Sequence, residues 1–458
     1  MEKKLHVVMF PWFAMGHMTP FLHLANKLAE RGHKTTLLLP NKSKLHLELL
    51  NLHPSLITLH PITVPHVDPL PQGTETASDI AIHLTNHLAT ALDLTQPEVK
   101  AIVATLLPVD LMFYDMAHWI PEVASLFNIK TVCYKVVCAA SLAIAVVPAR
   151  NLARDRPITE EDVAQPPPGY PSKDVVLHGP EARSLLFIGL EFGSGLTFYE
   201  RVSMSVASSD AIAIRTCREI EGSFCDYMGS QYNKPVFLTG PILPESGPAR
   251  GSLDAPWAEW LGQYAPGEVI FCAFGSQFIL EQDQFQEIVL GFEMTNLPFL
   301  VAVKPPTGCA SIEEALPEGF KERVGDRGVI TGGWVQQPLI LAHPSVGCFV
   351  NHCGFGSMWE SLTAKSQIVL VPQLGDQILN TRLMAGELKV AVEVEKTENG
   401  WVSKESLCKA IMSVMDEKSE IGCLVKNNHA KWRDMISSQG FMSGYIDNFV
   451  KDLLNLVA

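Results

Sequence analysis

Several classes of protein are excluded by what the sequence lacks. The 458 residues contain no apolar run long enough to cross a membrane: the longest, at residues 136–147, falls short of the roughly 20 residues that a spanning helix needs. The polar start of the chain and the short apolar run at residues 5–10 are not expected to form a secretory signal. Positive charge is scarce, with 35 Lys and Arg against 49 Asp and Glu and a formal net charge of −14. Because nucleic acids and anionic membranes bind clustered cations, neither is an expected partner.

Disulfide bonds and metal sites are not expected either. The ten cysteines are scattered, and none belongs to a Cys-x-x-Cys pair. Cys348 and Cys353 flank one turn, but no second metal-like cluster accompanies them. We interpret the cysteines as buried reduced thiols, so the sequence predicts a cytoplasmic protein without a bound metal ion.

The chain is rich in apolar runs that alternate with helical patterns. Residues 5–10 predict a strand, residues 19–31 carry apolar side chains at helical spacing, and residues 35–39 predict the next strand. The alternation continues through residues 101–137 and begins again at residues 269–274. It is typical of α/β domains in which helices cover both faces of a parallel sheet.

The length of the chain is too great for one ordinary core, so we expect two domains. The Gly- and Pro-rich residues 241–251 predict a linker between an N-terminal domain at residues 1–240 and a C-terminal domain at residues 252–437. In doubly wound sheets, ligands lie beyond the carboxyl ends of the strands. We therefore expect two Rossmann-like domains that face each other across a cleft.

The most informative segment spans residues 334–377. Within it, an apolar run ends at residues 351–357, Asn-His-Cys-Gly-Phe-Gly-Ser, and a helical pattern and a second apolar run follow. This order predicts strand, turn, helix and strand. The turn would present the His352 imidazole, the Ser357 hydroxyl and backbone amides at a helix N-terminus, which is a favourable site for a phosphate. Lys365 is the single Lys or Arg of the segment, so neutral donors and the helix end would have to bind the phosphate.

Each of these signals is weak when taken alone. A lone His before a helix is more often a capping or packed residue, and residues 354–359 lack the third glycine of the G-x-G-x-x-G pattern. Their combination with other groups in one segment is more specific. Trp334 could stack on a base, and Glu360 could accept the hydroxyls of a ribose. Beyond the last strand, Asp376 and Gln377 could bind a sugar.

From Trp334 to Gln377 the segment resembles the signature box of the plant UDP-sugar-dependent glycosyltransferases of secondary metabolism, and its most specific part is WVQQPLILAHPSVGCFVNHCG. The resemblance extends over essentially the whole chain. Residues 355–360, Phe-Gly-Ser-Met-Trp-Glu, are similar to the branch that adds a sugar to an existing glycoside. The commoner, aglycone-directed members have Trp-Asn-Ser at the first three of these positions.

The resemblance implies a GT-B fold and a metal-independent donor site. Consistent with this, the chain has no Asp-x-Asp pair, by which metal-dependent sugar transferases hold the diphosphate.

The implied donor-binding residues are Ser276, Trp334, Val335, Gln337, His352, Gly356, Ser357, Glu360, Asp376 and Gln377. Trp334 would stack on uracil and the Val335 backbone would bond its edge. Gln337 and Glu360 would hold the ribose, and Ser276, His352 and Ser357 the diphosphate. Asp376 and Gln377 would hold the sugar, and Gly356 would act through its backbone. No cofactor is implied, and the co-substrate would be UDP-glucose, UDP-rhamnose or UDP-xylose.

Inverting transfer requires a base that removes a proton from the acceptor hydroxyl as the oxygen attacks the anomeric carbon. A neutral His suits this task. A carboxylate on its other ring nitrogen would fix the tautomer and stabilise the imidazolium, as in the serine hydrolase triad. His17 follows the first predicted strand, and Asp115 follows the strand that ends at Tyr114. From position alone either residue could be an ordinary cap, whereas the resemblance identifies them as the catalytic dyad of the family.

The acceptor pocket is expected in the N-terminal domain. Its candidate lining residues are Trp12, Phe13, Tyr114, Trp119 and Phe187, although most residues of this kind belong to an ordinary core. His118 either belongs to the site or packs below it. The resemblance also implies that residues 438–458 form a terminal helix that packs back on this domain.

We therefore predict the transfer of a sugar from a UDP-sugar to a hydroxyl of a flavonoid, other phenolic or terpenoid glycoside by a monomeric enzyme. An aglycone O-glucosyltransferase of the same family is the first alternative. A UDP-sugar epimerase or a phosphorylase would share the architecture, but a phosphorylase usually needs more basic groups than Lys365 supplies. A non-enzymatic carrier or receptor for a small ligand would not require both His17 and Asp115.

Overall fold

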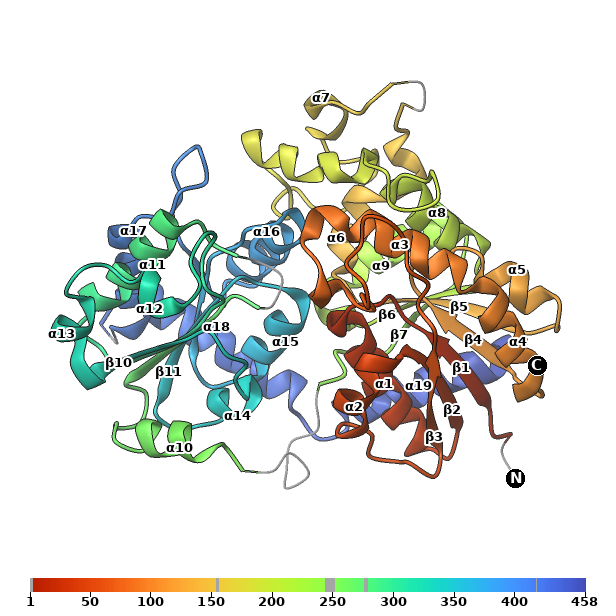
Figure 1. Ribbon diagram of the computed structural model, residues 1–458, viewed down its shortest axis with the longest axis horizontal. Helices are drawn as coiled ribbons and strands as arrows, with labels where there is room; N and C mark the ends of the chain where they lie inside the picture. Colours follow the sequence, from red (N-terminus) through yellow and green to blue (C-terminus); the bar gives the residue numbers. More distant parts are fainter. Residues whose placement is uncertain (1–2, 154–155, 244–251, 276–278, 417) are drawn as a thin grey trace. The chain divides into compact units, whose positions relative to one another are not determined.

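The computed structural model describes residues 3–153, 156–243, 252–275, 279–416 and 418–458 (Figure 1), and the chain divides into two compact units. The first unit consists of Met1–Ser172, Glu181–Pro244 and Gln439–Ala458, and the second of Lys173–Pro180 and Glu245–Ser438. Residues 244–251, most of the predicted linker, lie outside the described residues.

A seven-stranded parallel sheet forms the centre of the first unit. In spatial order its strands are β3 (Ile57–Ile62), β2 (Lys34–Pro40), β1 (His6–Phe10), β4 (Leu111–Tyr114), β5 (Lys130–Lys135), β6 (Ala211–Ile214) and β7 (Val236–Leu238). The helices are α1 (Met15–Ala29), α2 (Asn41–Glu48), α3 (Thr85–Leu94), α4 (Gln96–Leu106), α5 (Ile120–Ser125), α6 (Ala139–Ala145), α7 (Glu160–Val163), α8 (Phe198–Ser208), α9 (Arg218–Tyr232) and α19 (Phe441–Leu456).

Both faces of this sheet are buried. In β1, Val7 and Met9 pack into one apolar cluster together with residues of α1 and α19. Val8 and Phe10 point to the opposite face and are also fully buried. Continuous burial along a strand is expected where helices cover both faces of a parallel sheet, so the predicted α/β class is confirmed.

The order of strands in the first unit reverses between β1 and β4. These two strands lie side by side, with Val7 opposite Leu111 and Phe10 opposite Tyr114. β2 and β3 extend the sheet on one side of this pair and β5 to β7 on the other. Such a switch point leaves space for a ligand beyond the carboxyl ends of the two central strands.

The second unit repeats this plan with a six-stranded parallel sheet. In spatial order its strands are β10 (Gly328–Thr331), β9 (Phe299–Ala302), β8 (Val269–Ala273), β11 (Val346–Asn351), β12 (Gln367–Leu370) and β13 (Val392–Glu393). The helices are α10 (Ala255–Leu261), α11 (Gln282–Met294), α12 (Ile312–Ala315), α13 (Phe320–Val324), α14 (Gln337–Leu341), α15 (Phe355–Thr363), α16 (Gly375–Thr381), α17 (Lys404–Met415) and α18 (Glu420–Ile436). The switch point of this sheet lies between β8 and β11.

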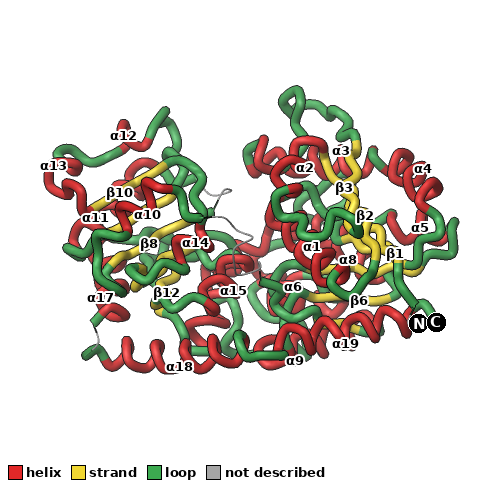
Figure 2. Tube along the Cα trace, turned by 90° about the horizontal axis from the view of Figure 1, so that it is seen from below, coloured by secondary structure: helices red, strands yellow, loops and turns green. Residues whose placement is uncertain are grey.

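The last helix, α19, packs on the sheet of the first unit (Figure 2). Its Ile446, Phe449 and Leu453 are fully buried in the cluster that contains Val7 and Met9. Helix α18, which precedes it in sequence, belongs to the second unit. The chain therefore completes the second unit before its last segment returns to the core of the first.

The first helix begins earlier than its sequence predicts. We expected it at residues 19–31, where Phe21, Leu24, Ala25 and Leu28 lie at helical spacing. In the structure α1 begins at Met15, and the Ala14 carbonyl accepts hydrogen bonds from the His17 and Met18 amides. Packing outweighs the bond lost at the proline, since Pro20 and its neighbour Phe21 are buried. His17 thus lies in the first turn of a helix and not in a preceding loop.

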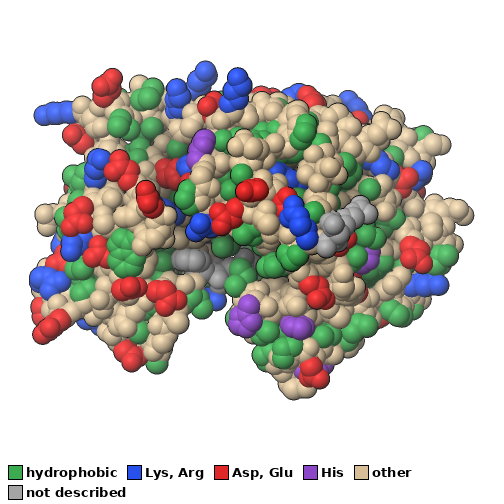
Figure 3. Space-filling view, turned by 90° about the horizontal axis from the view of Figure 1, so that it is seen from above, with side chains coloured by type: hydrophobic (Ala, Val, Ile, Leu, Met, Phe, Trp, Pro, Cys, Tyr) green, Lys and Arg blue, Asp and Glu red, His purple; other side chains and the backbone are tan. Residues whose placement is uncertain are grey.

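Two further features concern the surface and the apolarity of the helices. On the face drawn in Figure 3, Lys and Arg side chains are scattered among acidic and uncharged ones. Within the described part of the chain, none of the helices combines the length and the apolar character needed to cross a membrane.

Candidate active site

His17 and Asp115 meet at the switch point of the first unit. Nδ1 of His17 lies 2.5 Å from Oδ2 of Asp115. His17 is held in the first turn of α1, which follows β1, and Asp115 directly follows β4. The two predicted residues, 98 positions apart, are thus brought together by the pairing of two neighbouring strands.

The Asp115 carboxylate is buried, and the hydrogen bonds to its two oxygens fix its orientation. Oδ1 accepts hydrogen bonds from the Trp12 and Met116 amides, both at 2.7 Å. Oδ2 is directed at the His17 ring. The side chain of Asp115 is 2% exposed, whereas that of His17 is 25% exposed, so the carboxylate orients the imidazole from inside while the ring reaches the surface of the unit.

Lys135, which the sequence analysis missed, lies under the dyad. Its ammonium group is buried at the end of β5 and donates a 2.7 Å hydrogen bond to the Asp115 carbonyl oxygen. The available signal was a single cation that ends the apolar run of residues 131–135. A buried ammonium needs an acceptor, and here that acceptor is the carbonyl group of Asp115.

The geometry of the dyad determines which ring nitrogen can act as a base. A carboxylate only accepts hydrogen bonds, so the nitrogen that faces it, Nδ1, carries the proton. In the neutral ring Nε2 then has the lone pair. This arrangement can take a proton from a hydroxyl and stabilise the imidazolium that results, which is the task of a general base.

The predicted turn of the second unit lies at the switch point between β8 and β11. His352 directly follows β11, and its ring packs against Gly275, which follows β8. A Cβ atom at Gly275 would lie 3.0 Å from the ring, and one at Gly354 would lie 2.7 Å from it. The lack of a side chain at these two glycines therefore makes room for the imidazole. At Gly356, by contrast, no atom lies within 4 Å of where a Cβ would be, so this backbone is open to a ligand.

His352 is a neutral residue of this turn. Burial lowers the pKa of His352 to about 4. Its Nδ1 has no hydrogen-bond partner among the described residues. Ser276, which was predicted to share the diphosphate with His352, lies outside the described residues.

The turn is held in shape by two asparagines. Cys353 has a φ of +56°, a backbone conformation that is uncommon for a residue with a side chain. Its amide donates to the Asn351 side chain, and its carbonyl oxygen accepts from the Asn380 side chain, both at 2.8 Å. Asn380 comes from α16, so this helix fixes the turn from the far side.

Helix α15 begins directly after the turn, at Phe355, and its first amides are not capped by the side chain before it. The preceding residue, Gly354, has no side chain to accept their hydrogen bonds. These amides and the positive end of the helix can therefore interact with an anion. One turn further on, Glu360 accepts a 2.5 Å hydrogen bond from Gln337. The two predicted ribose-binding residues are thus linked to each other.

The remaining donor-binding candidates also lie in the second unit. Trp334 is 77% exposed, so its indole ring can stack on a flat ligand. Val335 is buried beside it, and its carbonyl oxygen accepts a hydrogen bond from the Gln337 amide. Oε1 of Gln377 accepts hydrogen bonds from the Gln373 and Leu374 amides, which leaves Nε2 as the atom that can donate to a sugar. Asp376 precedes it in the first turn of α16.

The acceptor candidates differ in burial. Phe13 and Tyr114 have no exposed surface, and the Tyr114 hydroxyl donates to the Ser205 carbonyl, so both belong to the core of the first unit. Trp12 and Trp119 are each 5% exposed, whereas Phe187 is 40% exposed.

A row of aromatic rings joins Trp12 to Phe187 through Phe192 and Phe198. The centroid distances along the row are 5.5, 5.2 and 4.9 Å. Phe192 and Phe198 were not predicted, because their proximity to Trp12 depends on contacts distant in sequence.

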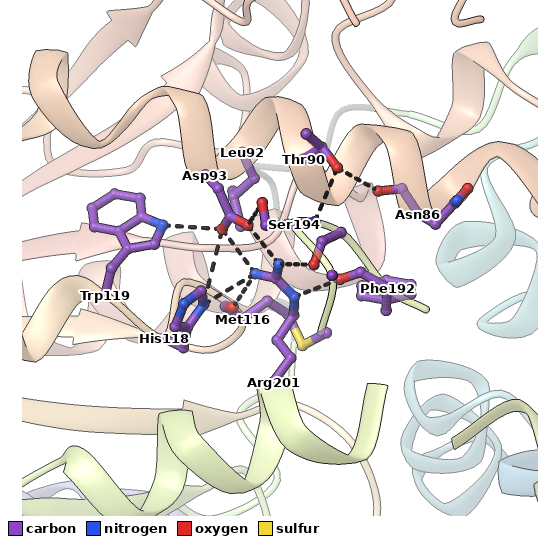
Figure 4. A network of polar contacts seen from close by, with 12 residues as sticks. Asn86, Thr90, Leu92, Asp93, Met116, His118, Trp119, Phe192, Ser194 and Arg201 are labelled. Carbon is purple, nitrogen blue, oxygen red and sulfur yellow. Dashed lines mark hydrogen bonds and ion pairs between the residues drawn. The ribbon is translucent and has the colours of Figure 1, made fainter. Parts of the chain in front are cut away.

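His118 packs beneath this region and does not resemble His17. Its Nδ1 lies 3.3 Å from a guanidinium nitrogen of Arg201 (Figure 4). A guanidinium only donates, so Nδ1 of His118 has the lone pair and Nε2 carries the proton. Burial and the charge of Arg201 both lower the pKa of His118, which keeps the ring neutral. The interpretation in which His118 packs below the site agrees with this geometry.

Among the described residues there is no cluster of three or more His, Cys, Asp or Glu side chains that could hold a metal ion.

Comparisons with known proteins show the family to which the chain belongs. Residues 319–428 match the family described as UDP-glucoronosyl and UDP-glucosyl transferase. The chain is 56% identical over 459 residues to the anthocyanidin 3-O-glucoside 2'''-O-xylosyltransferase of Arabidopsis thaliana, covering 100% of this chain and 98% of that protein. It is 58% identical over 458 residues to UDP-glucosyl transferase 79T1 of Saponaria officinalis, covering 99% of each.

A solved structure shows the same fold. Arabidopsis thaliana UGT89C1 complexed with UDP-L-rhamnose has a TM-score of 0.77 and 22% identity, covering 99% of this chain and 100% of that chain. Relatives of such identity over their whole length establish the family and confirm the prediction made from residues 334–377. The chain belongs to the UDP-glycosyltransferases of plants.

Proposed function

We propose that this enzyme transfers a sugar, with inversion, from a UDP-sugar to a hydroxyl of a plant glycoside, with His17 as the general base. The observation that carries the proposal is the 2.5 Å contact between Nδ1 of His17 and Oδ2 of Asp115. It leaves Nε2 as the basic atom of a side chain that is 25% exposed. A buried carboxylate with both oxygens in use is a fixed orienting group, as base catalysis requires.

The proposed step is a single displacement. Nε2 of His17 accepts the proton of the acceptor hydroxyl as its oxygen attacks the anomeric carbon of the donor sugar. The bond between that carbon and the diphosphate breaks on the opposite face, so the configuration inverts and UDP leaves. Asp115 stabilises the imidazolium until its proton passes to solvent. A well-placed base of this kind contributes about 10²–10⁴-fold in rate.

The second unit would bind the donor. We assign the diphosphate to His352, Ser357 and the first amides of α15, and the uracil to the exposed face of Trp334 and the Val335 backbone. Gln337 and Glu360 would hold the ribose as one hydrogen-bonded pair. The neutral state of His352 supports this role, since the ring can donate to a phosphate oxygen without the cost of burying a charge.

The sugar itself would be held by Asp376 and by Nε2 of Gln377. Glucose, rhamnose and xylose are the candidates. One relative is a xylosyltransferase, and one solved structure of the same fold is a complex with UDP-L-rhamnose, which supports this range.

We assign the acceptor to the class of flavonoid, other phenolic or terpenoid glycosides. Residues 355–357, Phe-Gly-Ser, support a sugar hydroxyl as the nucleophile, because they match the glycoside-directed branch. The relative from Arabidopsis thaliana whose name specifies a glucoside acceptor points the same way. The aromatic row from Trp12 to Phe187 suits the flat body of such an acceptor.

We infer a monomer in the cytoplasm. Buried thiols such as Cys133, Cys272 and Cys348, which are free in the structure, support a reducing compartment.

A substrate screen tests the function. Purified enzyme is incubated with UDP-glucose, UDP-rhamnose or UDP-xylose against free flavonoid and terpenoid aglycones and their matched monoglucosides, and the products are identified by mass spectrometry and NMR. We expect transfer to the glucosides, with the new sugar on a sugar hydroxyl and the inverted configuration. Preference for the free aglycones would establish the aglycone-directed alternative. Binding of acceptors without any transfer would favour a carrier.

A further inference from the structure

A buried polar network of the first unit centres on Arg201 in α8 (Figure 4). Its side chain has no exposed surface. Nε donates to the Phe192 carbonyl at 2.6 Å, and Nη2 donates to the Gly193 carbonyl at 3.1 Å. Nη1 donates to the Met116 carbonyl at 3.3 Å. One side chain thus binds the backbone of two loops that are distant in sequence.

Asp93 of α3 neutralises this guanidinium. Its Oδ1 and Oδ2 lie 2.9 and 2.6 Å from Nη1 and Nη2 of Arg201, a two-point ion pair. Asp93 also accepts hydrogen bonds from the Trp119 ring at 3.1 Å and the Ser194 hydroxyl at 2.6 Å. Burial would raise the pKa of Asp93, but the bonds from Arg201 outweigh it, so the carboxyl group remains ionised at neutral pH.

Both loops that Arg201 binds lead directly to the catalytic dyad. Met116 follows Asp115, and its amide donates to the Asp115 carboxylate. The Phe192 ring lies 5.5 Å from the ring of Trp12, whose amide donates to the other side of the same carboxylate oxygen. The guanidinium is therefore one residue away from Asp115, which orients His17, on one path, and two side chains away from Asp115 on the other.

Stability alone does not account for such a pair. Burying two charges costs as much as their attraction returns in many proteins, and apolar replacements of similar size are often at least as stable. What an apolar pair could not do is hold three backbone carbonyls in a fixed arrangement. Arg201 binds Phe192 and Gly193, and Asp93 binds Ser194, so the pair holds the loop that carries an aromatic ring to Trp12.

We propose that Arg201 and Asp93 are positioning residues for the acceptor: they hold residues 192–194 and Met116 so that the wall beside His17 fits the acceptor and keeps water out. This inference rests on the proposed function, because it needs His17 to act on an acceptor hydroxyl. Loosening the wall would allow water to replace the acceptor. The water oxygen would then bond to the anomeric carbon, its proton would pass to His17, and free sugar and UDP would be released.

The experiment measures the ratio of free sugar to glycoside product at saturating UDP-sugar. This ratio does not depend on the fraction of the protein that is folded. The first variant, Arg201→Lys, keeps the charge but loses the planar group with its several donors. The second, Arg201→Met with Asp93→Asn, removes both charges and preserves the fold if the lysine variant is unstable. Arg215→Lys is the matched control, because Arg215 is a buried arginine of the same unit that donates to the Pro241 and Ile242 carbonyls.

We expect the ratio of hydrolysis to transfer and the KM for the acceptor to rise by about 10–100-fold in both Arg201 variants, since small displacements of a reacting group have effects of this size. The KM for the UDP-sugar should stay within about twofold, and Arg215→Lys should lower the melting temperature at most. An unchanged ratio and acceptor KM in folded Arg201 variants would overturn the inference. If the wild-type enzyme transfers no sugar to any acceptor, the proposed function itself fails, which is a different outcome.

Discussion

At the scale of single residues, Asp115 connects more of the site than any other side chain described above. Its Oδ1 accepts hydrogen bonds from two backbone amides, and its Oδ2 faces His17. Its backbone carbonyl oxygen accepts a hydrogen bond from Lys135. Because Oδ1 is hydrogen-bonded to two amides, Oδ2 is the oxygen that faces the imidazole. The tautomer of the base is therefore a property of the loops around the carboxylate.

Asp115→Asn should abolish this control of the tautomer. Oδ1 would keep its two backbone amides, so the new NH₂ group would face Nδ1 of His17. The ring would then carry its proton on Nε2 and could not accept one from the acceptor. We expect kcat to fall by about 10⁴-fold, as in hydrolases with the corresponding change, while the UDP-sugar still binds.

Steady-state kinetics and calorimetric titration of UDP-sugar check this outcome, with Asp110→Asn as the matched control. Asp110 also accepts a backbone amide at the edge of a strand, that of His6 at 2.8 Å, but contacts no proposed catalytic group. The control should keep its kcat. Equal kinetics for the two variants would contradict the role of Asp115.

Sequence patterns identified the dyad but not the residues that hold it. His17 and Asp115 each follow an apolar strand, and the resemblance to the family joined them. Lys135 and Arg201 gave no such signal, because a single cation in an apolar segment or on a helix does not indicate its partner. Their partners, Asp115 and Asp93, are 20 and 108 positions away.

At the scale of elements, the turn after β11 depends on a neighbouring helix. Cys353 keeps its left-handed backbone because Asn380 of α16, which is fully buried, donates to its carbonyl. The sequence predicted the strand, the turn and the helix of this unit, since all three depend on local patterns. It did not predict that α16 fixes the turn, because that contact spans 27 residues.

Asn380→Ala should loosen the donor turn. The Cys353 carbonyl would lose its partner, at a cost of about 1–3 kcal/mol in the free energy of unfolding. Displacement of His352 should raise the KM for the UDP-sugar by about tenfold, equivalent to about 1.4 kcal/mol, and leave the acceptor KM almost unchanged. Kinetics in each substrate test this against Asn428→Ala, which removes a half-buried asparagine that donates to the Lys389 carbonyl in the same unit. A rise confined to the acceptor KM would refute the assignment of the turn to the donor.

Helix α19 makes the first unit dependent on the end of the chain. Phe449 is fully buried, and its ring centroid lies 6.1 Å from that of Phe113 in β4 and 6.4 Å from that of Phe237 in β7. Phe449→Ala should lower the free energy of unfolding by about 3–5 kcal/mol. Chemical denaturation followed by circular dichroism measures the loss. The exposed Lys451→Ala on the same helix should change stability by less than about 0.5 kcal/mol, and an equal effect of both variants would contradict this packing.

At the scale of the whole molecule, two buried neutral histidines make stability depend on pH. Burial lowers the pKa of both His352 and His429 from 6.5 to about 4. Between these values the unfolded chain binds protons that the folded chain does not, so the free energy of unfolding falls as the pH decreases from 6.5 towards 4. The loss is at most about 3 kcal/mol for each residue. The pKa of Asp93 is lowered, so its protonation reduces the free energy of unfolding only at a lower pH, below 3.8.

Urea denaturation from pH 7 to pH 4.5 tests this dependence. His429 lies 3.0 Å from the Ser361 carbonyl and contacts no proposed substrate group, so His429→Gln isolates the effect of titration. The variant should show a shallower fall of the free energy of unfolding with decreasing pH. The same slope as in the wild-type enzyme would show that His429 does not titrate in this range.

The organisation of the whole chain was predictable where it depends on alternation of strands and helices. Two parallel sheets with similar strand order follow from that alternation. The grouping of Lys173–Pro180 with the second unit was not predictable, because no local pattern indicates with which unit an irregular segment will pack. The start of α1 was misplaced because the spacing of apolar residues indicates that a helix is present but not where its first turn begins.

We propose above that His17 removes the proton of the acceptor hydroxyl during transfer from a UDP-sugar. The most direct measurement is the rate of glycoside formation by His17→Ala at saturating substrates, together with the affinity for the UDP-sugar. We predict that kcat falls by about 10²–10⁴-fold while the affinity for the UDP-sugar stays within about twofold. Transfer at the wild-type rate by His17→Ala would show that His17 is not the general base.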